Sequence, residues 1–302
     1  MKAIVIGGSG QIGGWLLRHL AERGHETVGT YATVAYPGLV ALNAADRDTA
    51  ADWVRSQRPE VVFYPAGFTW VDGCERDPDK ARASNRDEPL NLALAAAESD
   101  ARFVYFSTDY VFNGTTGPDA EDSPTHPPNI YGLAKLEAEA ALTEALGDRV
   151  LIARTSWVYG PERQGKNFAY QVVRNLKASN AMPTPSDMAS SPSYAPDVAL
   201  ATLQLAEQGK SGVWHVAGPE VVARSEFARG IALAFGLDPA LIQPRPTSEI
   251  VQGAPRPLQG GLKIEKLEAQ LPGLMRPMAS ALEDFLARLD AHQSWADPRS
   301  EV

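Results

Sequence analysis

Residues 3–13, Ala-Ile-Val-Ile-Gly-Gly-Ser-Gly-Gln-Ile-Gly, decide the fold. The apolar run 3–6 is typical of a strand that is buried on both faces of a parallel sheet. A G-x-x-G-x-x-G pattern fills 7–13, and helical spacing of apolar residues continues to Arg23. Glycines at such a turn let the backbone approach a pyrophosphate, and the free N–H groups of the following helix would bind it. The opening of the chain therefore predicts a dinucleotide-binding loop.

Strand and helix patterns alternate over the first 155 residues. The expected strands are 3–6, 25–31, 60–64, 103–106 and 150–153, and the expected helices are 11–23, 46–57, 79–99 and 131–146. This alternation predicts an α/β fold, a Rossmann-type doubly wound parallel sheet with helices on both faces. Residues 1–155 would form the dinucleotide-binding domain.

Proline and glycine become denser after Trp157, which indicates a change of architecture. We interpret 156–302 mostly as a smaller C-terminal substrate-binding lobe over the carboxyl edge of the sheet, where ligands of open α/β sheets bind. Residues 190–217 are expected to return to the first domain through a helix at 196–208 and a strand at 212–216. The polar end, 291–302, is expected to fray.

Composition excludes several classes of function. The chain has 302 residues and a formal net charge of -9, whereas proteins that grip nucleic acid are usually basic. Its one cysteine, Cys74, and five scattered histidines show no metal-ligand spacing. No apolar run approaches the length of a membrane span or a signal-peptide core. We therefore expect a cytoplasmic protein that binds no metal, no nucleic acid and no membrane.

The end of the second expected strand bears on the choice of cofactor. An NAD-binding site usually carries an acidic residue there, about 20 residues after the glycine loop. This chain has Thr30-Tyr31 instead, so no carboxylate would repel a 2′-phosphate, and no arginine stands nearby in the sequence to hold one. We expect NADP(H) to be preferred, with NAD(H) also accepted.

Tyr131 and Lys135 form a Y-x-x-x-K pattern at the start of a helix. The spacing places both side chains on one face, about one turn apart. A tyrosine must overcome about 3 pH units, roughly 4 kcal/mol, to exchange its proton near neutral pH, and a neighbouring cation would lower its pKa. Thr108, at the end of a strand, would polarise a carbonyl. The non-catalytic alternative for this pattern is a surface tyrosine with a solvated lysine, and the upstream glycine loop disfavours it.

Together these motifs resemble the extended short-chain dehydrogenase/reductase family, and more closely its dTDP-4-dehydrorhamnose reductases. The stretches that carry the resemblance are Val71-Asp72 with Glu75, Asn85, 107–112, 129–132, 154–160, 166–168, 191–194 and Arg256-Pro257. The resemblance implies that Tyr131 donates a proton, Lys135 orients the cofactor ribose and Thr108 binds the substrate oxygen. Related dehydratases carry a glutamate at the position of Tyr110, so dehydration is not expected here.

The resemblance also implies two sets of binding residues. The cofactor would contact Gly7, Gly10, Gln11, Ile12, Gly13, Thr30, Ala66, Gly67 and Asn85, together with Tyr131 and Lys135. The substrate would contact Thr69, Val71, Tyr110, Trp157, Asn167 and Arg256. Three alternatives stay open: Trp157 as a core aromatic, Asn85 as a structural residue near the cofactor, and Arg256 as a solvated loop residue.

The chain also departs from the pattern. Trp70 and Tyr64-Pro65 stand where relatives carry smaller residues or Asn-Ala, and Trp70 would add bulk beside the sugar pocket. Trp15 lies where some members of the family bind a bridging metal through glutamates, so we predict no metal. The expected function is reduction of a keto group on a nucleotide-linked sugar. The alternatives are a reductase of another carbonyl, or a non-catalytic NADP-binding subunit similar to that of methionine adenosyltransferase. A homodimer is compatible with each of these functions.

Overall fold

The computed structural model describes residues 1–291 and 296–299. Its centre is a parallel seven-stranded sheet in the order β11-β6-β5-β4-β1-β2-β3. The strands are β1 Lys2–Val5, β2 Glu26–Tyr31, β3 Leu39–Ala41, β4 Val61–Tyr64, β5 Arg102–Thr108, β6 Val150–Thr155 and β11 Gly212–His215. This is the doubly wound order with one further strand at the edge beside β6, so the predicted fold class is confirmed.

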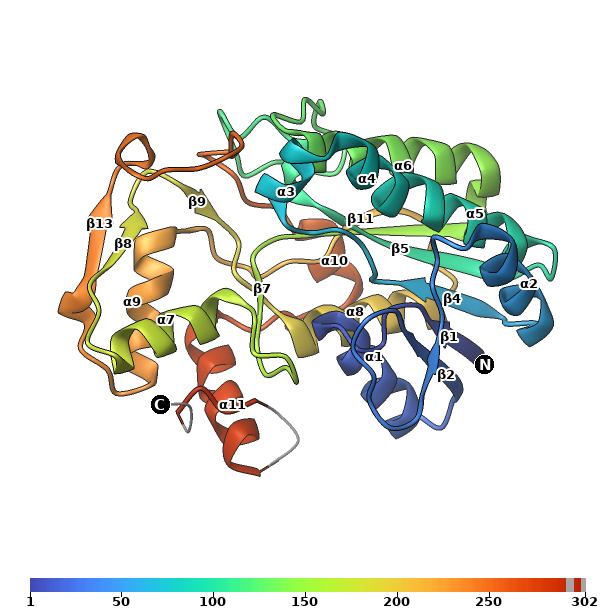
Figure 1. Ribbon diagram of the computed structural model, residues 1–302, viewed down its shortest axis with the longest axis horizontal. Coiled ribbons are helices and arrows are strands. Elements are labelled where there is room, and N and C mark those ends of the chain that lie inside the picture. Colours follow the sequence, from blue (N-terminus) through green and yellow to red (C-terminus); the bar gives the residue numbers. More distant parts are fainter. Residues whose placement is uncertain (292–295, 300–302) are drawn as a thin grey trace.

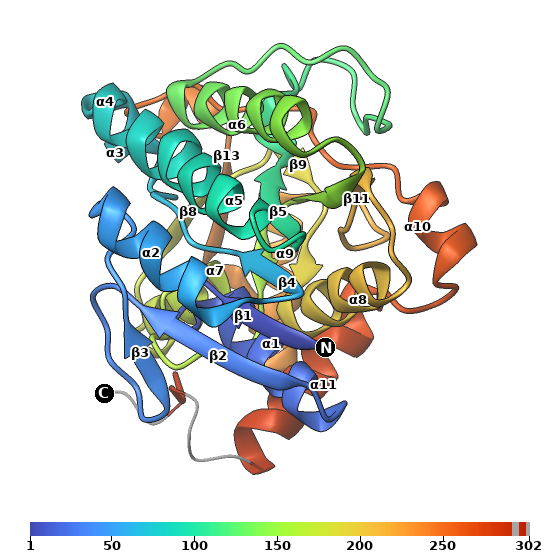
Figure 2. The same ribbon diagram turned by 90° about the vertical axis from the view of Figure 1, so that its right-hand side faces the viewer.

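Helices cover both faces of this sheet. One face packs against α1 Gln11–Glu22 and α8 Ala195–Glu207, and the other against α2 Arg47–Gln57, α5 Glu88–Ala97 and α6 Ile130–Leu146 (Figure 2). Alternating residues of β1, together with Ile6, which follows it, supply the two cores: Ala3 and Val5 join the first, Ile4 and Ile6 the second. A strand buried on both sides explains why its sequence is a continuous apolar run.

The long helix expected at 79–99 is interrupted. It consists of α4 Pro78–Arg82, a π-helical turn Ala83–Asp87 and α5, and it is preceded by a short helix, α3 Val71–Arg76. π-Helical turns are rare and frequently occur at functional sites. Here the turn contains Asn85, whose side chain is buried beneath the carboxyl edge of β4.

The remaining segments build a second lobe beside the carboxyl edge of the sheet (Figure 1). Its helices are α7 Phe168–Lys177, α9 Arg224–Ala234 and α11 Met278–Ala291. Short strand pairs complete it: β7 Val158–Tyr159 with β10 Ser193–Tyr194, β9 Ala189–Ser190 with β12 Val222–Ala223, and β8 Met182–Pro185 with β13 Ile242–Arg245.

Three later segments pack on the first domain. Within the expected returning segment 190–217, α8 packs on α1 and β11 extends the sheet beside β6. Helix α10, Glu265–Gln270, also contacts β11. The sequence did not indicate that this later segment packs on the first domain.

The expected fraying of 291–302 does not hold for all of that segment. In its described part, the backbone N–H of Ala296 donates to Glu162, and the carbonyl of Ala296 accepts from the Tyr170 hydroxyl. Residues 292–295 and 300–302 lie outside the described residues. Within the described ranges, no helix has the length and apolar character needed to cross a membrane.

Candidate active site

The glycine loop lies between β1 and α1 and has the geometry of a phosphate cradle. Gly7 has a φ of 91°, and a Cβ added at Gly13 would lie 2.2 Å from the carbonyl oxygen of Gly7. Only glycine fits both positions. Gly10 precedes α1 and provides no side-chain cap, so no capping side chain occupies the first N–H groups of the helix. The buried Gln11 Nε2 also has no hydrogen-bond partner in the described part of the chain. These features fit a dinucleotide pyrophosphate.

Thr30 is buried, and its Oγ1 accepts a hydrogen bond from the backbone N–H of Gly7 at 3.2 Å. Its side chain therefore supports the glycine loop from β2. A cavity of about 460 Å³ lies beside this loop and is lined by Ser9, Gly10, the start of β3 and Arg163. The guanidinium of Arg163 lies 4.7 Å from the ring centroid of Tyr36.

The segment after β4 is held by a buried amide. The Asn85 side chain accepts from the Phe68 N–H at 3.1 Å and donates to the Phe68 carbonyl at 3.0 Å. A Cβ on Gly67 would lie 2.6 Å from Asn85 Oδ1 and 3.5 Å from Lys135 Nζ. Both the oxygen and the nitrogen of the Asn85 amide are thus used, which favours a structural role for Asn85 over a contact with the cofactor. Ala66 packs against Gly7, so this segment lies beside the glycine loop.

Thr108 ends β5 in a turn fixed by a buried acid. Its Oγ1 accepts from the Tyr110 N–H at 3.1 Å and donates to Asp109 at 3.2 Å. The Asp109 carboxylate accepts from Ser156 at 2.8 Å and from Ser190 at 2.7 Å. This network ties the end of β5 to the second lobe and fixes the position of the Thr108 hydroxyl.

Tyr131 lies at the start of α6, facing the Thr108 turn. Asn129 caps the helix by accepting from the Gly132 N–H at 2.8 Å. A Cβ on Gly132 would come within 2.1 Å of the Tyr110 carbonyl oxygen, so glycine allows α6 to begin against this turn. The rings of Tyr131 and Tyr110 meet edge to face at 6.0 Å.

Lys135 lies one turn further along α6 and is buried. Its Nζ donates to the Phe106 carbonyl at 2.9 Å and lies 4.5 Å from the centroid of the Tyr105 ring. Burial lowers the pKa of Lys135 from 10.5 to about 7, although Glu139 opposes the change. Lys135 therefore carries only part of a positive charge at neutral pH.

The expected lowering of the Tyr131 pKa is wrong for the protein without ligand. Burial raises the Tyr131 pKa well above 10, and the nearby Asp109 and Cys74 add to the rise. A hydrogen-bonding interaction with Thr108 opposes it. The sequence indicated the lysine but not the burial that weakens its charge and disfavours the phenolate. Tyr131 therefore keeps its proton at neutral pH, which is the form that a general acid needs.

A buried ion pair joins α6 to the sheet. Arg154, on β6, binds both carboxylate oxygens of Glu139, with Nη2 to Oε2 at 2.6 Å and Nε to Oε1 at 3.0 Å. Ser107 also donates to Glu139 at 2.5 Å. Because Glu139 follows Lys135 by one helical turn, this cluster fixes α6 against β5 and β6.

The residues expected to contact substrate have different environments. Thr69 is exposed, while Val71, Tyr110 and Trp157 are partly exposed. Trp157 has a φ of 39°, an uncommon left-handed conformation for a bulky residue. Its ring stacks on Phe227, with 6.3 Å between centroids, so it joins an aromatic cluster and keeps a partly exposed surface.

Two of these residues are already engaged. The Asn167 amide caps α7 by accepting from Ala169 and donates to the Gly160 carbonyl and to Glu162. Arg256 pairs with Asp72 at 2.7 Å and holds the pKa of that carboxyl below its usual range. The Asn167 contacts favour a structural role over substrate binding, and Arg256 is a paired residue rather than a solvated one.

Residues 1–291 match the RmlD substrate binding domain family. The chain belongs to this family. It is similar to the probable low-salt glycan biosynthesis reductase of Haloferax volcanii, with 34% identity covering 96% of this chain and 98% of that one. It is also similar to the dTDP-4-dehydrorhamnose reductase of Mycolicibacterium smegmatis, with 31% identity covering 95% of this chain and 85% of that one.

Among solved structures, the RmlD-family chain resembles dTDP-4-dehydrorhamnose reductase from Bacillus anthracis in complex with NADP. The TM-score is 0.86 at 27% identity, covering 95% of this chain and all of that one. These similarities make the chain an oxidoreductase of the extended short-chain dehydrogenase/reductase type. It is also 28% identical to methionine adenosyltransferase 2 subunit beta of Xenopus laevis, over 97% of this chain and 90% of that one.

Two arginines near the ligand-facing surfaces of this RmlD-family protein were missed in the sequence. Arg163 lines the cavity at the glycine loop from a segment after β7, far along the chain from β2. Arg224, at the start of α9, lies over the rings of Trp157 and Phe168. Contacts between such distant segments leave no local pattern, so only the fold brings these residues together.

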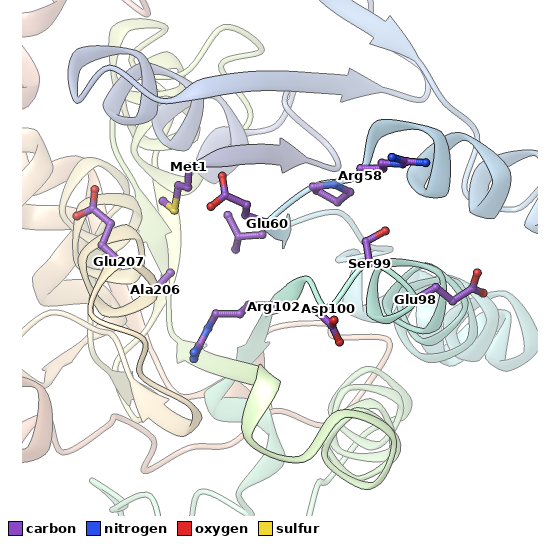
Figure 3. A pocket seen from close by; sticks show the side chains of 11 residues that line it. Met1, Arg58, Glu60, Glu98, Ser99, Asp100, Arg102, Ala206 and Glu207 are labelled. Carbon is purple, nitrogen blue, oxygen red and sulfur yellow. The ribbon is translucent and has the colours of Figure 1, made fainter.

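A larger cavity, of about 850 Å³, lies away from this site. Figure 3 shows its lining side chains, which include Glu60 before β4, Arg102 at the start of β5 and Glu207 at the end of α8. They mark the amino edge of the sheet. Ligands of parallel sheets bind at the carboxyl edge, so this hollow is not the active site.

Proposed function

We propose that the protein reduces a keto group on a nucleotide-linked sugar with NAD(P)H, and that its substrate is dTDP-4-dehydrorhamnose. The arrangement of Thr108, Tyr131 and Lys135 at the carboxyl edge of the sheet carries the proposal. The similarity to named dTDP-4-dehydrorhamnose reductases favours this sugar. The similarity to a glycan biosynthesis reductase favours the same chemistry on a related sugar.

The chain's own groups account for the proton in this reaction. The Thr108 hydroxyl would turn from Asp109 to donate its hydrogen bond to the substrate carbonyl, and Tyr131 would give that oxygen its phenolic proton, so that the product is an alcohol. The bound reduced nicotinamide would supply the hydride. Tyr131 would then recover its proton from solvent, with Lys135 stabilising the transient phenolate.

We propose NADP(H) as the preferred cofactor, with NAD(H) also accepted. Gly7, Gly10 and Gly13 would cradle the pyrophosphate, with Gln11 and Ile12 at the start of α1 beside it. Thr30 would act through the loop that it supports. Arg163, beside Ser9 and Gly10, offers a guanidinium where the adenosine end of the cofactor would lie, and it could pair with a 2′-phosphate.

A direct assay tests the reaction. Purified protein is mixed with NADPH and the dTDP-4-keto-6-deoxyhexose, and the absorbance of the reduced cofactor is followed. We expect oxidation in the wild type and loss of most of it in Tyr131→Phe, with unchanged NADPH affinity by fluorescence titration. Normal turnover in Tyr131→Phe would refute the assignment of the proton donor. Parallel titrations with NADH and NADPH compare the two cofactors.

A second candidate function is supported by the similarity to the methionine adenosyltransferase subunit. In that case the protein would bind NADP and a partner enzyme but reduce no nucleotide sugar. Binding of purified methionine adenosyltransferase catalytic subunit, together with absent turnover, would favour it. If NADPH is oxidised only with other carbonyl compounds, the protein is a reductase of a different substrate, and the bulk of Trp70 beside the sugar pocket would explain why the nucleotide sugar is not accepted. The cytoplasmic location and the homodimer stay predictions.

A further inference from the structure

Arg224 is held between aromatic rings at the start of α9. Its guanidinium carbon lies 3.5 Å from the ring centroid of Phe168 and 4.5 Å from that of Trp157. Stacking of this kind fixes the plane of the guanidinium and leaves its N–H groups at the edges. An arginine held in this way is organised to bind an anion before the anion arrives.

This guanidinium has no anionic partner at contact distance. Within residues 1–291 and 296–299, no carboxylate pairs with Arg224, and its side chain makes no hydrogen bond. Asp109, which favours its charge from a distance, already accepts hydrogen bonds from Ser156 and Ser190. Arg224 is partly exposed, and the burial that it has lowers its pKa to about 10, so it stays charged at neutral pH. A charged, partly exposed guanidinium without an ionic partner is open to an anion that a ligand brings.

Arg224 lies on Trp157, one of the residues expected to line the sugar pocket. The Tyr110 ring contacts the Tyr131 ring; burial raises the Tyr110 pKa to about 12, and the charges of Arg256 and Arg224 oppose that rise. Tyr110 is therefore close to the proton donor and within the field of both arginines. In a pyranose, carbon 4 and carbon 1 are on opposite sides of the ring. A 4-keto group at Tyr131 would thus direct the phosphate on carbon 1 away from Tyr131.

We propose that Arg224 binds the diphosphate of the nucleotide-sugar substrate. The inference rests on the proposed function, because it takes the sugar carbonyl to lie at Tyr131. The edges of the guanidinium would donate two parallel N–H bonds to phosphate oxygens. Arg256 stays paired with Asp72 and adds positive potential near Tyr110. Since α9 belongs to the second lobe, this contact would let the second lobe hold the substrate while the first holds the reacting groups.

The test measures binding of dTDP, which carries the diphosphate but no sugar. Calorimetric titration in the presence of NADP⁺ compares the wild type with Arg224→Gln and Arg224→Lys. We expect Arg224→Gln to weaken dTDP binding about 10- to 100-fold, the range for lost hydrogen bonds to a charged group, and Arg224→Lys to lose less. Arg229→Gln is the matched control, because Arg229 is exposed on the same helix. NADPH affinity should be equal in all four proteins.

The outcomes separate this inference from the proposed reaction. If the wild type binds no dTDP, or if folded Arg224→Gln binds it as the wild type does, the inference fails whatever the enzyme reduces. If dTDP binding depends on Arg224 but no sugar is reduced, the reductase proposal fails and the diphosphate site stands. In active protein, Arg224→Gln should raise KM for the nucleotide sugar with little change in kcat. Equal thermal unfolding of the Gln and Lys variants would separate lost binding from lost folding.

Discussion

Replacing Lys135 by methionine should stabilise the protein while removing its activity. Lys135 is 3% exposed, and burial lowers its pKa from 10.5 to about 7. At about 1.4 kcal/mol per pH unit, this gap corresponds to at most about 5 kcal/mol of lost stability below pH 7. The lysine's bond to the Phe106 carbonyl, about 1 kcal/mol, is lost in the variant, and relaxation around the buried ammonium makes the penalty smaller than this upper limit. We therefore expect Lys135→Met to gain about 2–3 kcal/mol near pH 6.5.

The pH dependence gives this prediction its sharpest test. Between pH 7 and 10.5 the unfolded chain binds a proton at Lys135 that the folded protein does not. The contribution of Lys135 to wild-type stability therefore rises with pH, by up to about 1.4 kcal/mol per unit. The advantage of the methionine variant should shrink over the same range. Below pH 7 both states bind the proton and the difference should be constant.

Urea unfolding of cofactor-free protein at pH 6.5, 8.0 and 9.5 measures these differences, with Lys80→Met as an exposed control. The reasoning is refuted if Lys135→Met is less stable than the wild type at pH 6.5, or if the difference does not change with pH. A control variant with the same pH dependence would show that the effect does not come from burial.

Three further changes test other parts of the site. Gly13→Ala should weaken NADPH binding at least about 10-fold in a fluorescence titration, because the added Cβ would lie 2.2 Å from the Gly7 carbonyl oxygen. Gly14→Ala is the control and should bind NADPH normally, because its Cβ would lie 3.7 Å from the Gly8 carbonyl oxygen. Glu139→Ala should lower the free energy of urea unfolding by about 3–5 kcal/mol, since it leaves Arg154 buried and unpaired, and the double change Glu139→Leu with Arg154→Met should recover most of that loss. Arg163→Gln should raise the NADPH dissociation constant about 10-fold and leave NADH unchanged; equal loss for both cofactors would contradict a 2′-phosphate contact.

The sequence could predict those features that depend on neighbouring residues. The strand, glycine turn and helix at 2–22 follow from local apolar spacing and from glycine at positions where a side chain does not fit. The one-turn spacing of Tyr131 and Lys135 is likewise a property of a single helix. The short strand β3 has little local signal, and the expected helix at 79–99 concealed a π-helical turn because its residues have helical character throughout.

Features that depend on distant segments could not be predicted. Arg256 resembles a binding residue in the sequence, but its hydrogen bond to Asp72 exists only in the fold. Asn167 also resembles one, and its hydrogen bonds to Gly160 and Glu162 depend on the conformation of the irregular loop between β7 and α7. Arg224 gave no signal, because its aromatic neighbours belong to two other segments. The direction of the Tyr131 pKa shift failed for the same reason, since burial is set by all the elements around the cleft.

This burial bears on the protonation state from which the reaction starts. Carbonyl reduction starts from the protonated phenol, which would give its proton to the developing alkoxide, whereas the reverse reaction requires the phenolate at the start. Burial disfavours that phenolate and also weakens the charge of Lys135 that would stabilise it. Without ligand, the chain's own groups therefore hold Tyr131 in the protonated form that carbonyl reduction uses. A bound cofactor that brings positive charge beside Tyr131 would favour the phenolate that alcohol oxidation uses.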